Sequence, residues 1–285
     1  MRKAWPTLVI AALLTAFLSG TLRPPVKADT AASTFDLVKQ RGTLIVGVAP
    51  DKPPMGYYNK EGQLVGYGAD MAAAVAKELG VKLKLVAATS ETRIPLLTSG
   101  QVDAVFDSST DTVAREKVVD FTIIYNWDAV VPLVRAGENV DIKQYGPPKK
   151  VSSTQGNYTI TLFKDAVPNG DVVTYPAFPE AVVALINHKV DAVLMNRFDA
   201  TAYTKEYPGK LAVGDEFFHD PQAISIRQND SKWRRTLNFI LQKMWLSGEF
   251  QRIYKQDFGY NPPFPSIWTI WRLQPGIDKW NLSDS

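Results

Sequence analysis

Two segments of the chain share one layout, IPLLTSGQVDAVF at residues 94–106 and VVALINHKVDAVL at residues 182–194. Each contains an apolar helix-like run, a polar turn and then Val-Asp-Ala-Val, which begins at Val102 and at Val190. The Val-Asp-Ala-Val run is typical of a buried strand. A match of four residues is weak evidence alone. Its place in two similar β-α-β segments predicts two similarly built lobes.

The sequence around both segments alternates between strand-like and helix-like runs. Residues 44–49 form a continuous apolar run, which is typical of a strand buried on both faces of a sheet. A helix is predicted over residues 71–79, with Asp70 as its N-cap and Gly80 as its C-terminal stop. Further strands are predicted at residues 82–88, 150–153 and 171–174. This alternation predicts mostly parallel sheets.

The predicted fold class is α/β, with two lobes that are each a mostly parallel sheet flanked by helices. The strand-like residues 121–134 and 222–226 lie where the chain crosses between the lobes, and we expect them to be two hinge strands. The first lobe is expected over residues 38–128 and the second over residues 129–222. Residues 223–285 are then expected to return to the first lobe as C-terminal helices and a tail.

Residues 1–28 have the composition of a cleaved secretory signal. Arg2 and Lys3 precede an apolar run at residues 8–18, and the segment ends with small residues at Val26 and Ala28. The alternative is a membrane anchor, but eleven apolar residues are too few to span a bilayer core of about 30 Å, which needs about 20. We therefore expect export to the periplasm.

The charge of the chain changes once this segment is removed. The full chain of 285 residues has 32 basic and 29 acidic residues and a net charge of +3. Four of the basic residues and none of the acidic ones lie within residues 1–28, which leaves a net charge of −1. A nucleic-acid partner is therefore not expected. Because the chain has no cysteine, disulfides, thiolate metal sites and a lipidated N-terminal Cys are excluded.

Polar loops follow the predicted strands, and in parallel sheets such loops bind ligands. The most polar of them is Asp-Ser-Ser-Thr-Asp-Thr at residues 107–112, which leads into a short helix that carries Arg115. Hydroxyl groups, a helix start and a guanidinium together favour binding of a carboxylate. The alternative is simple N-capping by Ser or Thr, with Arg115 on a solvated face.

Motifs of common enzymes are absent from the sequence. There is no Gly-x-Ser-x-Gly, P-loop, dinucleotide-binding or His-Glu-x-x-His motif, and the chain has only two histidines. We therefore expect no catalytic residues, no metal and no cofactor, although scattered carboxylates leave a general acid–base pair open.

The sequence resembles the type 3 periplasmic solute-binding proteins of amino-acid ABC transporters over residues 38–260. The resemblance rests on the order and spacing of six runs: GTLIVGV at 42–48, VGYGAD at 65–70, RIPLL at 93–97, SGQVD at 99–103, TDTVAR at 110–115 and VDFT at 119–122. The runs TSETRIPLL at 89–97 and SST at 108–110 are similar to the glutamate/aspartate-binding branch. This family has the two-lobe periplasmic-binding-protein fold of type II, which closes on one amino acid.

The resemblance implies the following roles in the first lobe. Arg115 occupies the position of the Arg that holds the ligand's α-carboxylate, and Ser108 and Thr110 occupy positions that assist it. Ser90 and Arg93 match positions that bind the side-chain carboxylate in the glutamate/aspartate branch.

In the second lobe, the resemblance implies that Gln155, Asn157 and Tyr158 belong to a loop that offers N–H groups to the ligand. Asn196 stands where the family usually has an Asp that pairs with the α-ammonium group, so the usual charge is missing. Asp107 is an extra acid that either compensates for this loss or faces solvent. Ala49 replaces a basic residue of the glutamate/aspartate branch.

We therefore expect a monomeric, non-catalytic binding protein that delivers an amino acid, with a polar or acidic side chain favoured, to the membrane permease of an ABC importer. Two alternatives stay open. One is a periplasmic dehydratase for prephenate or arogenate on the same fold, and the other is a ligand-sensing binding protein.

Overall fold

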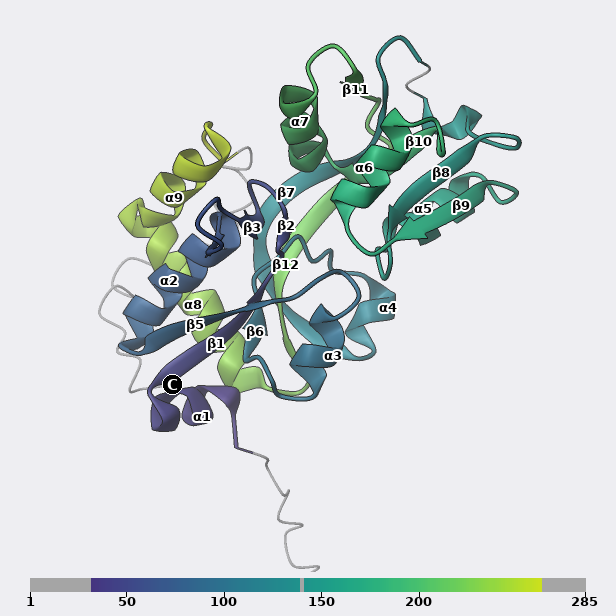
Figure 1. Ribbon diagram of the computed structural model, residues 1–285. Coiled ribbons are helices and arrows are strands. Elements are labelled where there is room, and N and C mark those ends of the chain that lie inside the picture. The colour runs from purple at the N-terminus through teal and green to yellow at the C-terminus, as the bar shows by residue number, and fades with distance from the viewer. Residues whose placement is uncertain (1–31, 139–140, 263–285) are drawn as a thin grey trace, which may run out of the picture. The chain divides into compact units, whose positions relative to one another are not determined.

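A nine-stranded sheet runs through the chain in the order β5-β1-β6-β12-β7-β10-β8-β9, with β11 paired to β7 (Figure 1). The computed structural model describes residues 32–138 and 141–262, so the predicted signal segment and the tail after residue 262 lie outside the described residues. The strands are β1 Thr43–Val48, β5 Lys82–Ala87, β6 Ala104–Val105, β7 Val119–Arg135, β8 Lys150–Thr154, β9 Asp171–Tyr175, β10 Ala192–Asn196, β11 Leu211–Val213 and β12 Phe218–Arg227. We call β5, β1 and β6 the first subsheet and β10, β8 and β9 the second subsheet.

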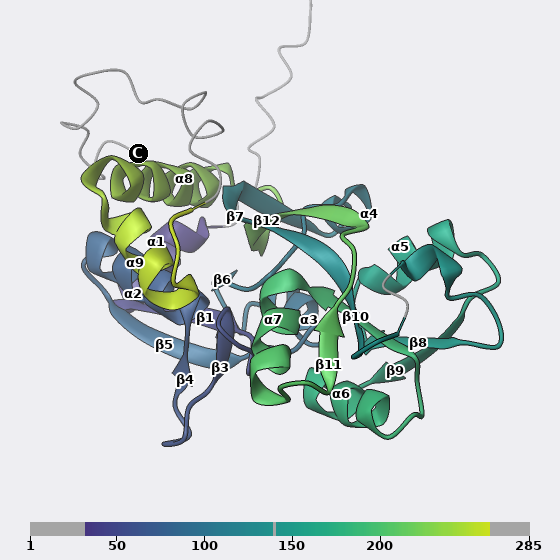
Figure 2. The same ribbon diagram turned by 90° about the horizontal axis from the view of Figure 1, so that it is seen from above.

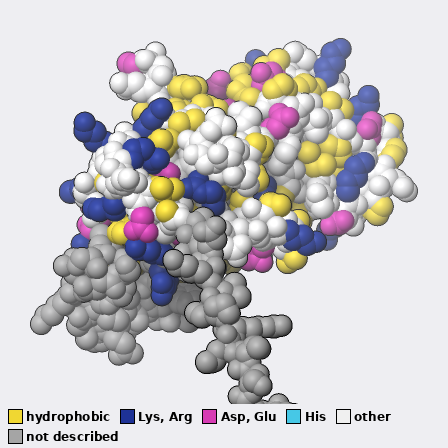
Figure 3. Space-filling view, turned by 90° about the horizontal axis from the view of Figure 1, so that it is seen from below, with side chains coloured by type: hydrophobic (Ala, Val, Ile, Leu, Met, Phe, Trp, Pro, Cys, Tyr) yellow, Lys and Arg dark blue, Asp and Glu magenta, His cyan; other side chains and the backbone are white. Residues whose placement is uncertain are grey.

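Helices accompany both subsheets, and a second sheet of β2 Asp51–Lys52, β3 Gly56–Tyr58 and β4 Leu64–Val65 follows β1. The helices are α1 Thr34–Arg41, α2 Tyr67–Leu79, α3 Arg93–Thr98, α4 Val113–Glu116, α5 Thr159–Ala166, α6 Phe178–Ile186, α7 Arg197–Glu206, α8 Ser231–Ser247 and α9 Glu249–Phe258. Among the described residues, every helix is too short or too polar to cross a bilayer. On the face shown in Figure 3, Lys and Arg side chains lie among acidic, apolar and uncharged ones.

The two predicted crossing segments are present as β7 and β12, which we call the linking strands. They pair antiparallel from Phe218 opposite Val130 to Arg227 opposite Val119, and Figure 2 shows them side by side. β12 also pairs with β6, and β7 pairs with β10. The linking strands therefore join the two mostly parallel subsheets, which confirms the predicted α/β class.

The Val-Asp-Ala-Val repeat has the same structural role in both subsheets. The backbone N–H of Asp103 donates to Ile45 O at 2.7 Å, and its carboxylate accepts the N–H of Ile45 at 2.8 Å. Likewise, the N–H of Asp191 donates to Lys150 O at 2.7 Å, and its carboxylate accepts the N–H of Lys150 at 2.7 Å. Each Asp thus ties the start of one strand to its parallel neighbour.

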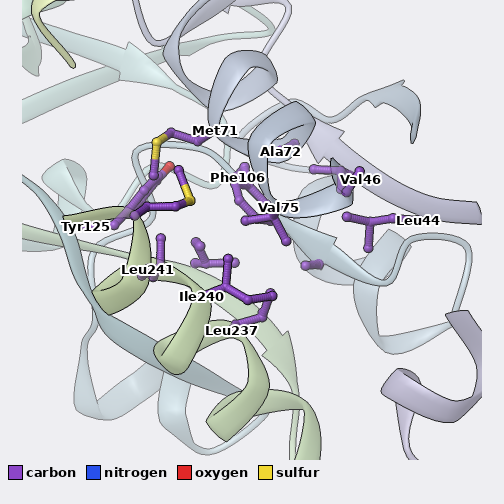
Figure 4. Close-up of a cluster of buried hydrophobic side chains, with 14 of the residues drawn as sticks. Leu44, Val46, Met71, Ala72, Val75, Phe106, Tyr125, Leu237, Ile240 and Leu241 are labelled. Carbon is purple, nitrogen blue, oxygen red and sulfur yellow. The ribbon is translucent and has the colours of Figure 1, made fainter. Parts of the chain in front are cut away.

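The largest apolar cluster lies between the first subsheet, β7 and the helices α2, α8 and α9. Figure 4 shows Leu44 and Val46 from β1 facing Val75 of α2, with Leu237 and Ile240 of α8 on the other side. These side chains are buried, as the spacing of apolar residues in both helices requires. Packing in this cluster therefore fixes the position of the first subsheet and of the loops that follow its strands.

The predicted N-cap at Asp70 is wrong, because α2 begins at Tyr67 and its N-cap is Gly66. Tyr67 is fully buried, and its hydroxyl donates to Tyr125 O at 2.8 Å. Gly68 lies against the backbone, because a Cβ atom there would be 2.2 Å from Phe106 O. The Gly-Tyr-Gly run, which lies before the predicted start of the helix, thus contains its N-cap and the buried beginning of its first turn.

The raised pKa of Asp128 in β7 should make the free energy of unfolding depend on pH. Burial raises its pKa to about 7, against backbone hydrogen bonds from Ala129 and Phe198 that favour the charged form. The folded state therefore binds more protons than the unfolded state between about pH 4 and pH 7, and the free energy of unfolding falls as the pH rises through this window. Burial also raises the pKa of Asp199 in α7, which adds to the same trend.

We expect Asp128→Asn to stabilise the protein at pH 8, by roughly 2–4 kcal/mol, and to change its stability little at pH 5. Urea denaturation of both proteins at the two pH values measures this difference. An equal effect of the substitution at pH 5 and pH 8 would contradict the assigned titration.

Candidate functional site

The loops that follow the strands of both subsheets meet at one place. Gly156, in the loop after β8, lies against the loop after β5, where a Cβ atom on Gly156 would be 2.8 Å from Ser90 O. The guanidinium carbon of Arg115 lies 5.2 Å from the ring centroid of Tyr158. Thr110 and Asn196 both donate to Asp220 of β12. Most of the predicted site residues are thus brought together with β12.

Asp107 is the centre of a buried charge cluster. Arg93 Nη1 donates to its carboxylate at 2.6 Å and Lys52 Nζ at 3.1 Å, and all three side chains are at most 2% exposed. Burial alone would raise the pKa of Asp107, but Lys52 and Arg93 hold it well below its usual range. The N–H of Ser108 also donates to the same carboxylate, at 2.6 Å. Asp107 is therefore an anion held by two cations.

This cluster corrects one of the expectations for Asp107. The carboxylate does not face solvent, because it is fully buried. Both of its oxygens are taken up by Lys52, Arg93 and Ser108, so it is poorly placed to replace the charge missing at Asn196. Arg93, in turn, directs Nη1 to Asp107, and its buried Nε has no hydrogen-bond partner among the described residues.

Arg115 lies at the edge of this cluster in α4. Thr112 is the N-cap of α4 and accepts the N–H of Arg115, so the predicted capping is present. The side chain of Arg115 is half-buried rather than solvated, and Nη1 donates to Thr110 O at 3.0 Å. Burial and the nearby charge of Arg93 lower the pKa of Arg115 to about 9. Among the described residues, no carboxylate forms an ion pair with Arg115.

A second buried carboxylate, Asp220, lies beside Arg115. Thr110 Oγ1 donates to Asp220 Oδ1 at 2.6 Å, and Gln222 Nε2 donates to Oδ2 at 2.7 Å. Asn196 Nδ2 donates to the same Oδ2. Burial and the charge of Asp220 raise the pKa of Tyr158, whose hydroxyl is buried without a partner of good geometry among the described residues.

In the loop after β8, the backbone N–H groups of Gln155 and Asn157 already have hydrogen-bond partners within the protein. The backbone N–H of Gln155 donates to Tyr175 O at 2.9 Å and that of Asn157 to Thr154 O at 3.1 Å, so both already serve the fold of the second subsheet. The Asn157 carboxamide accepts the N–H of Thr159 at 3.2 Å. By contrast, Ser90 Oγ is buried and has no partner in the described part of the chain.

Sequence reasoning missed two members of the site, Lys52 and Asp220. Neither residue is among the positions that the sequence or the family resemblance predicts to bind a ligand. The available signal for Asp220 was its place two residues before a strand predicted to cross between the lobes. Within residues 32–138 and 141–262, no group of three or more His, Asp or Glu side chains is arranged to hold a metal ion.

Comparisons with known proteins show the family of the chain. Residues 44–260 match the family model of bacterial extracellular solute-binding proteins, family 3. The chain belongs to this family, as its sequence runs predict.

Individual relatives of the chain bind different amino acids. A glutamine-binding protein of an ABC transporter from Bacillus subtilis is 27% identical over 83% of this chain and 87% of its own. An L-glutamate/L-aspartate-binding protein from Pseudomonas aeruginosa is 28% identical over 89% of this chain and 88% of its own. Because these identities are nearly equal, overall similarity does not select the side chain of the ligand.

A solved structure of an ancestral amino-acid-binding protein, described as a precursor of cyclohexadienyl dehydratase, has a TM-score of 0.74 to this chain. It is 30% identical and covers 79% of this chain and all of its own. The likeness confirms the predicted two-lobe class of fold.

Proposed function

We propose that the protein binds a single amino acid outside the cytoplasm and delivers it to the permease of an ABC importer. The observation that carries this proposal is Arg115, a half-buried guanidinium next to a helix start without an ion-pair partner among the described residues. An α-carboxylate on Arg115 would gain two parallel hydrogen bonds. Its charge would also offset the repulsion between Arg115 and Arg93 that lowers the pKa of Arg115.

The unpartnered donors beside this position favour a polar or acidic ligand side chain. Ser90 Oγ and Arg93 Nε are both buried and lack hydrogen-bond partners among the described residues. Buried polar groups are rarely left without a partner. Oxygen atoms of a glutamate- or glutamine-like side chain would accept hydrogen bonds from both donors.

Closure of the two subsheets around the ligand is the proposed mechanism, with the linking strands as the hinge. Two contacts in the structure support it, because Arg115 stacks on Tyr158 and Gly156 lies against Ser90. Burial of the ion pairs in the closed form would strengthen them. The permease would then recognise the closed, monomeric protein in the periplasm.

Gly156→Ala tests this closure. Gly156 has φ of +71° and no room for a side chain, because a Cβ atom would be 2.8 Å from Ser90 O and 2.9 Å from Glu91 Cα. We expect the substitution to weaken ligand binding by about tenfold or more, equal to about 1.4 kcal/mol, since the loop could no longer reach the first subsheet. Isothermal titration calorimetry measures the affinity.

Gly209→Ala is a matched control for this substitution. Gly209 has nearly the same φ, +73°, but open space around its Cβ position. Both substitutions carry a similar backbone strain of about 1–2 kcal/mol, and only Gly156→Ala adds a contact between the subsheets. Equal affinities for the two variants would argue against closure at this loop.

A screen of the protein without residues 1–28 against the twenty L-amino acids tests the function itself. A ligand at 100 times its Kd raises the free energy of unfolding by about 2.7 kcal/mol, which thermal denaturation detects. We expect one or a few polar or acidic amino acids to give this stabilisation. No stabilisation by any amino acid would contradict the proposal.

The same preparation tests the dehydratase alternative. We propose that the protein is not an enzyme, so incubation with prephenate or arogenate should release no aromatic product. The ancestral structure keeps this test relevant, because it is described both as an amino-acid-binding protein and as a dehydratase precursor. A sensory role would differ only in the membrane partner, and pull-down of the liganded protein with its permease separates the two.

A further inference from the structure

Asp220 is a fully buried carboxylate whose hydrogen-bond partners are all uncharged. It accepts from the hydroxyl of Thr110 and from the carboxamides of Gln222 and Asn196. A carboxamide N–H can only donate, so both of these bonds suit an ionised carboxylate, which only accepts. No Lys, Arg or His of the described residues forms an ion pair with it, whereas the other buried acid of the site, Asp107, has two.

A buried anion without a cation is costly, and such groups are normally paired. The hydrogen bonds around Asp220 hold it in place, since Gln222 in turn accepts from Asn126 of β7 at 2.7 Å. They do not neutralise it. Among the described residues of the site, Arg115 is thus a cation and Asp220 an anion that form no ion pair.

The two groups are separated by a single residue. The carbonyl oxygen of Thr110 accepts from Arg115 at 3.0 Å, and the hydroxyl of Thr110 donates to Asp220 at 2.6 Å. In an α-amino acid, the ammonium nitrogen is only two bonds from the carboxylate carbon. A ligand held by Arg115 through its carboxylate must therefore place its ammonium group close to Thr110.

We infer that Asp220 supplies the negative charge that binds the α-ammonium group of the ligand, as a specificity-determining residue on a linking strand. This inference rests on the proposed function. It accounts for Asn196, the neutral residue at the position where the resemblance leads one to expect an Asp. Asn196 directs its Nδ2 to Asp220, which leaves its carboxamide oxygen turned away from Asp220 as an additional acceptor. The negative charge of the protein that faces the ligand's ammonium group is thus on β12, at Asp220, rather than at the end of β10, at position 196.

Amino acids and their desamino analogues separate this role from a structural one. The probes are L-glutamate with glutarate, L-glutamine with glutaramate, and L-arginine with 5-guanidinopentanoate. Each pair differs only in the α-ammonium group. The pair that contains the amino acid bound most tightly by the unsubstituted protein is then titrated into Asp220→Asn. A charged hydrogen bond of about 1.5–3 kcal/mol corresponds to roughly 10- to 150-fold in affinity.

We expect the unsubstituted protein to prefer the amino acid over its desamino analogue by at least tenfold. Asp220→Asn should lose this preference through weaker binding of the amino acid, with the affinity for the analogue changed by less than about threefold. Asp128→Asn, which removes the half-buried acid directly opposite Asp220 on β7, is the control and should keep the preference. The exchanged variant Asn196→Asp/Asp220→Asn should recover it, because the charge returns to the site.

Each other outcome overturns the inference. Equal losses for the amino acid and its analogue in Asp220→Asn would assign Asp220 a structural role only. An unchanged preference in Asp220→Asn would place the ammonium elsewhere, while binding of amino acids by the unsubstituted protein would keep the proposed function intact. If Asp220→Asn does not fold, the preference for the amino acid over its desamino analogue is still measured in the unsubstituted protein and in the exchanged variant. Absence of this preference in either of them overturns the inference. Failure of the unsubstituted protein to bind any amino acid would overturn the proposed function as well.

Discussion

Arg115→Ala should strongly weaken binding of the amino acid while the protein stays folded. Loss of one partner of a largely buried, hydrogen-bonded charge pair costs about 2–5 kcal/mol of binding free energy. The affinity should therefore fall by roughly 30-fold to a few thousand-fold. The free energy of unfolding should change by only about 1 kcal/mol. Among the described residues, the Arg115 side chain makes one hydrogen bond, to Thr110 O, and contacts the Tyr158 ring, and its removal relieves repulsion from Arg93.

Calorimetric titration and urea denaturation together measure both quantities. Arg115→Lys keeps the charge but not the paired geometry of the guanidinium, so we expect an intermediate affinity. Arg252→Ala removes an Arg whose side chain is 58% exposed and pairs with Glu249, and it should leave binding unchanged. Tight binding by Arg115→Ala would rule out the proposed site.

Asp107→Asn should cause the largest loss of stability among these substitutions. It would leave Lys52 and Arg93 as buried cations without their shared anion. Removing one partner of a buried ion pair typically costs about 3–5 kcal/mol. Because Lys52 and Arg93 lower the pKa of Asp107, its stabilising effect is fully present above the unfolded pKa near 4. It is lost only as the pH falls through the lower pKa of the folded state.

Urea denaturation at pH 7 should therefore show the full loss, and the difference from the unsubstituted protein should shrink in strong acid. Glu249→Gln is the matched control, because it breaks an exposed pair with Arg252 and should change the free energy of unfolding little. A comparable, small effect of both substitutions would mean that the Asp107 cluster does not stabilise the fold.

The fold could be predicted well because its strands are marked by apolar runs and by a repeat. Residues 121–134 and 222–226 are apolar enough to be recognised as crossing strands, and β7 and β12 contain them. The start of α2 could not be predicted in this way. Its Gly-Tyr-Gly sequence has low helix propensity, and only the packing of Tyr67 and Gly68 against distant residues makes it helical.

The candidate site was harder to predict, because its charges are decided by pairing across the chain. The sequence places Asp107 next to Ser108, but it does not show that Asp107 forms an ion pair with Lys52, which is 55 residues away. Asp220 is 110 residues from Thr110, its hydroxyl partner. A family resemblance identifies positions along the chain. Which acid can bind a ligand, however, depends on which acids already form ion pairs within the protein.

The strand order also determines when the chain can fold. β12, at residues 218–227, is paired with β6 and β7, which lie about one hundred residues earlier in the chain. The cluster beneath the first subsheet also needs α8 and α9, from the C-terminal part of the chain. The pairing of β12 with β6 and β7, and the cluster beneath the first subsheet, therefore cannot form until nearly the whole chain has been synthesised. The second subsheet, by contrast, lies within residues 150–196. Such long-range pairing raises the contact order and slows folding, so this part of the molecule should fold more slowly than the second subsheet.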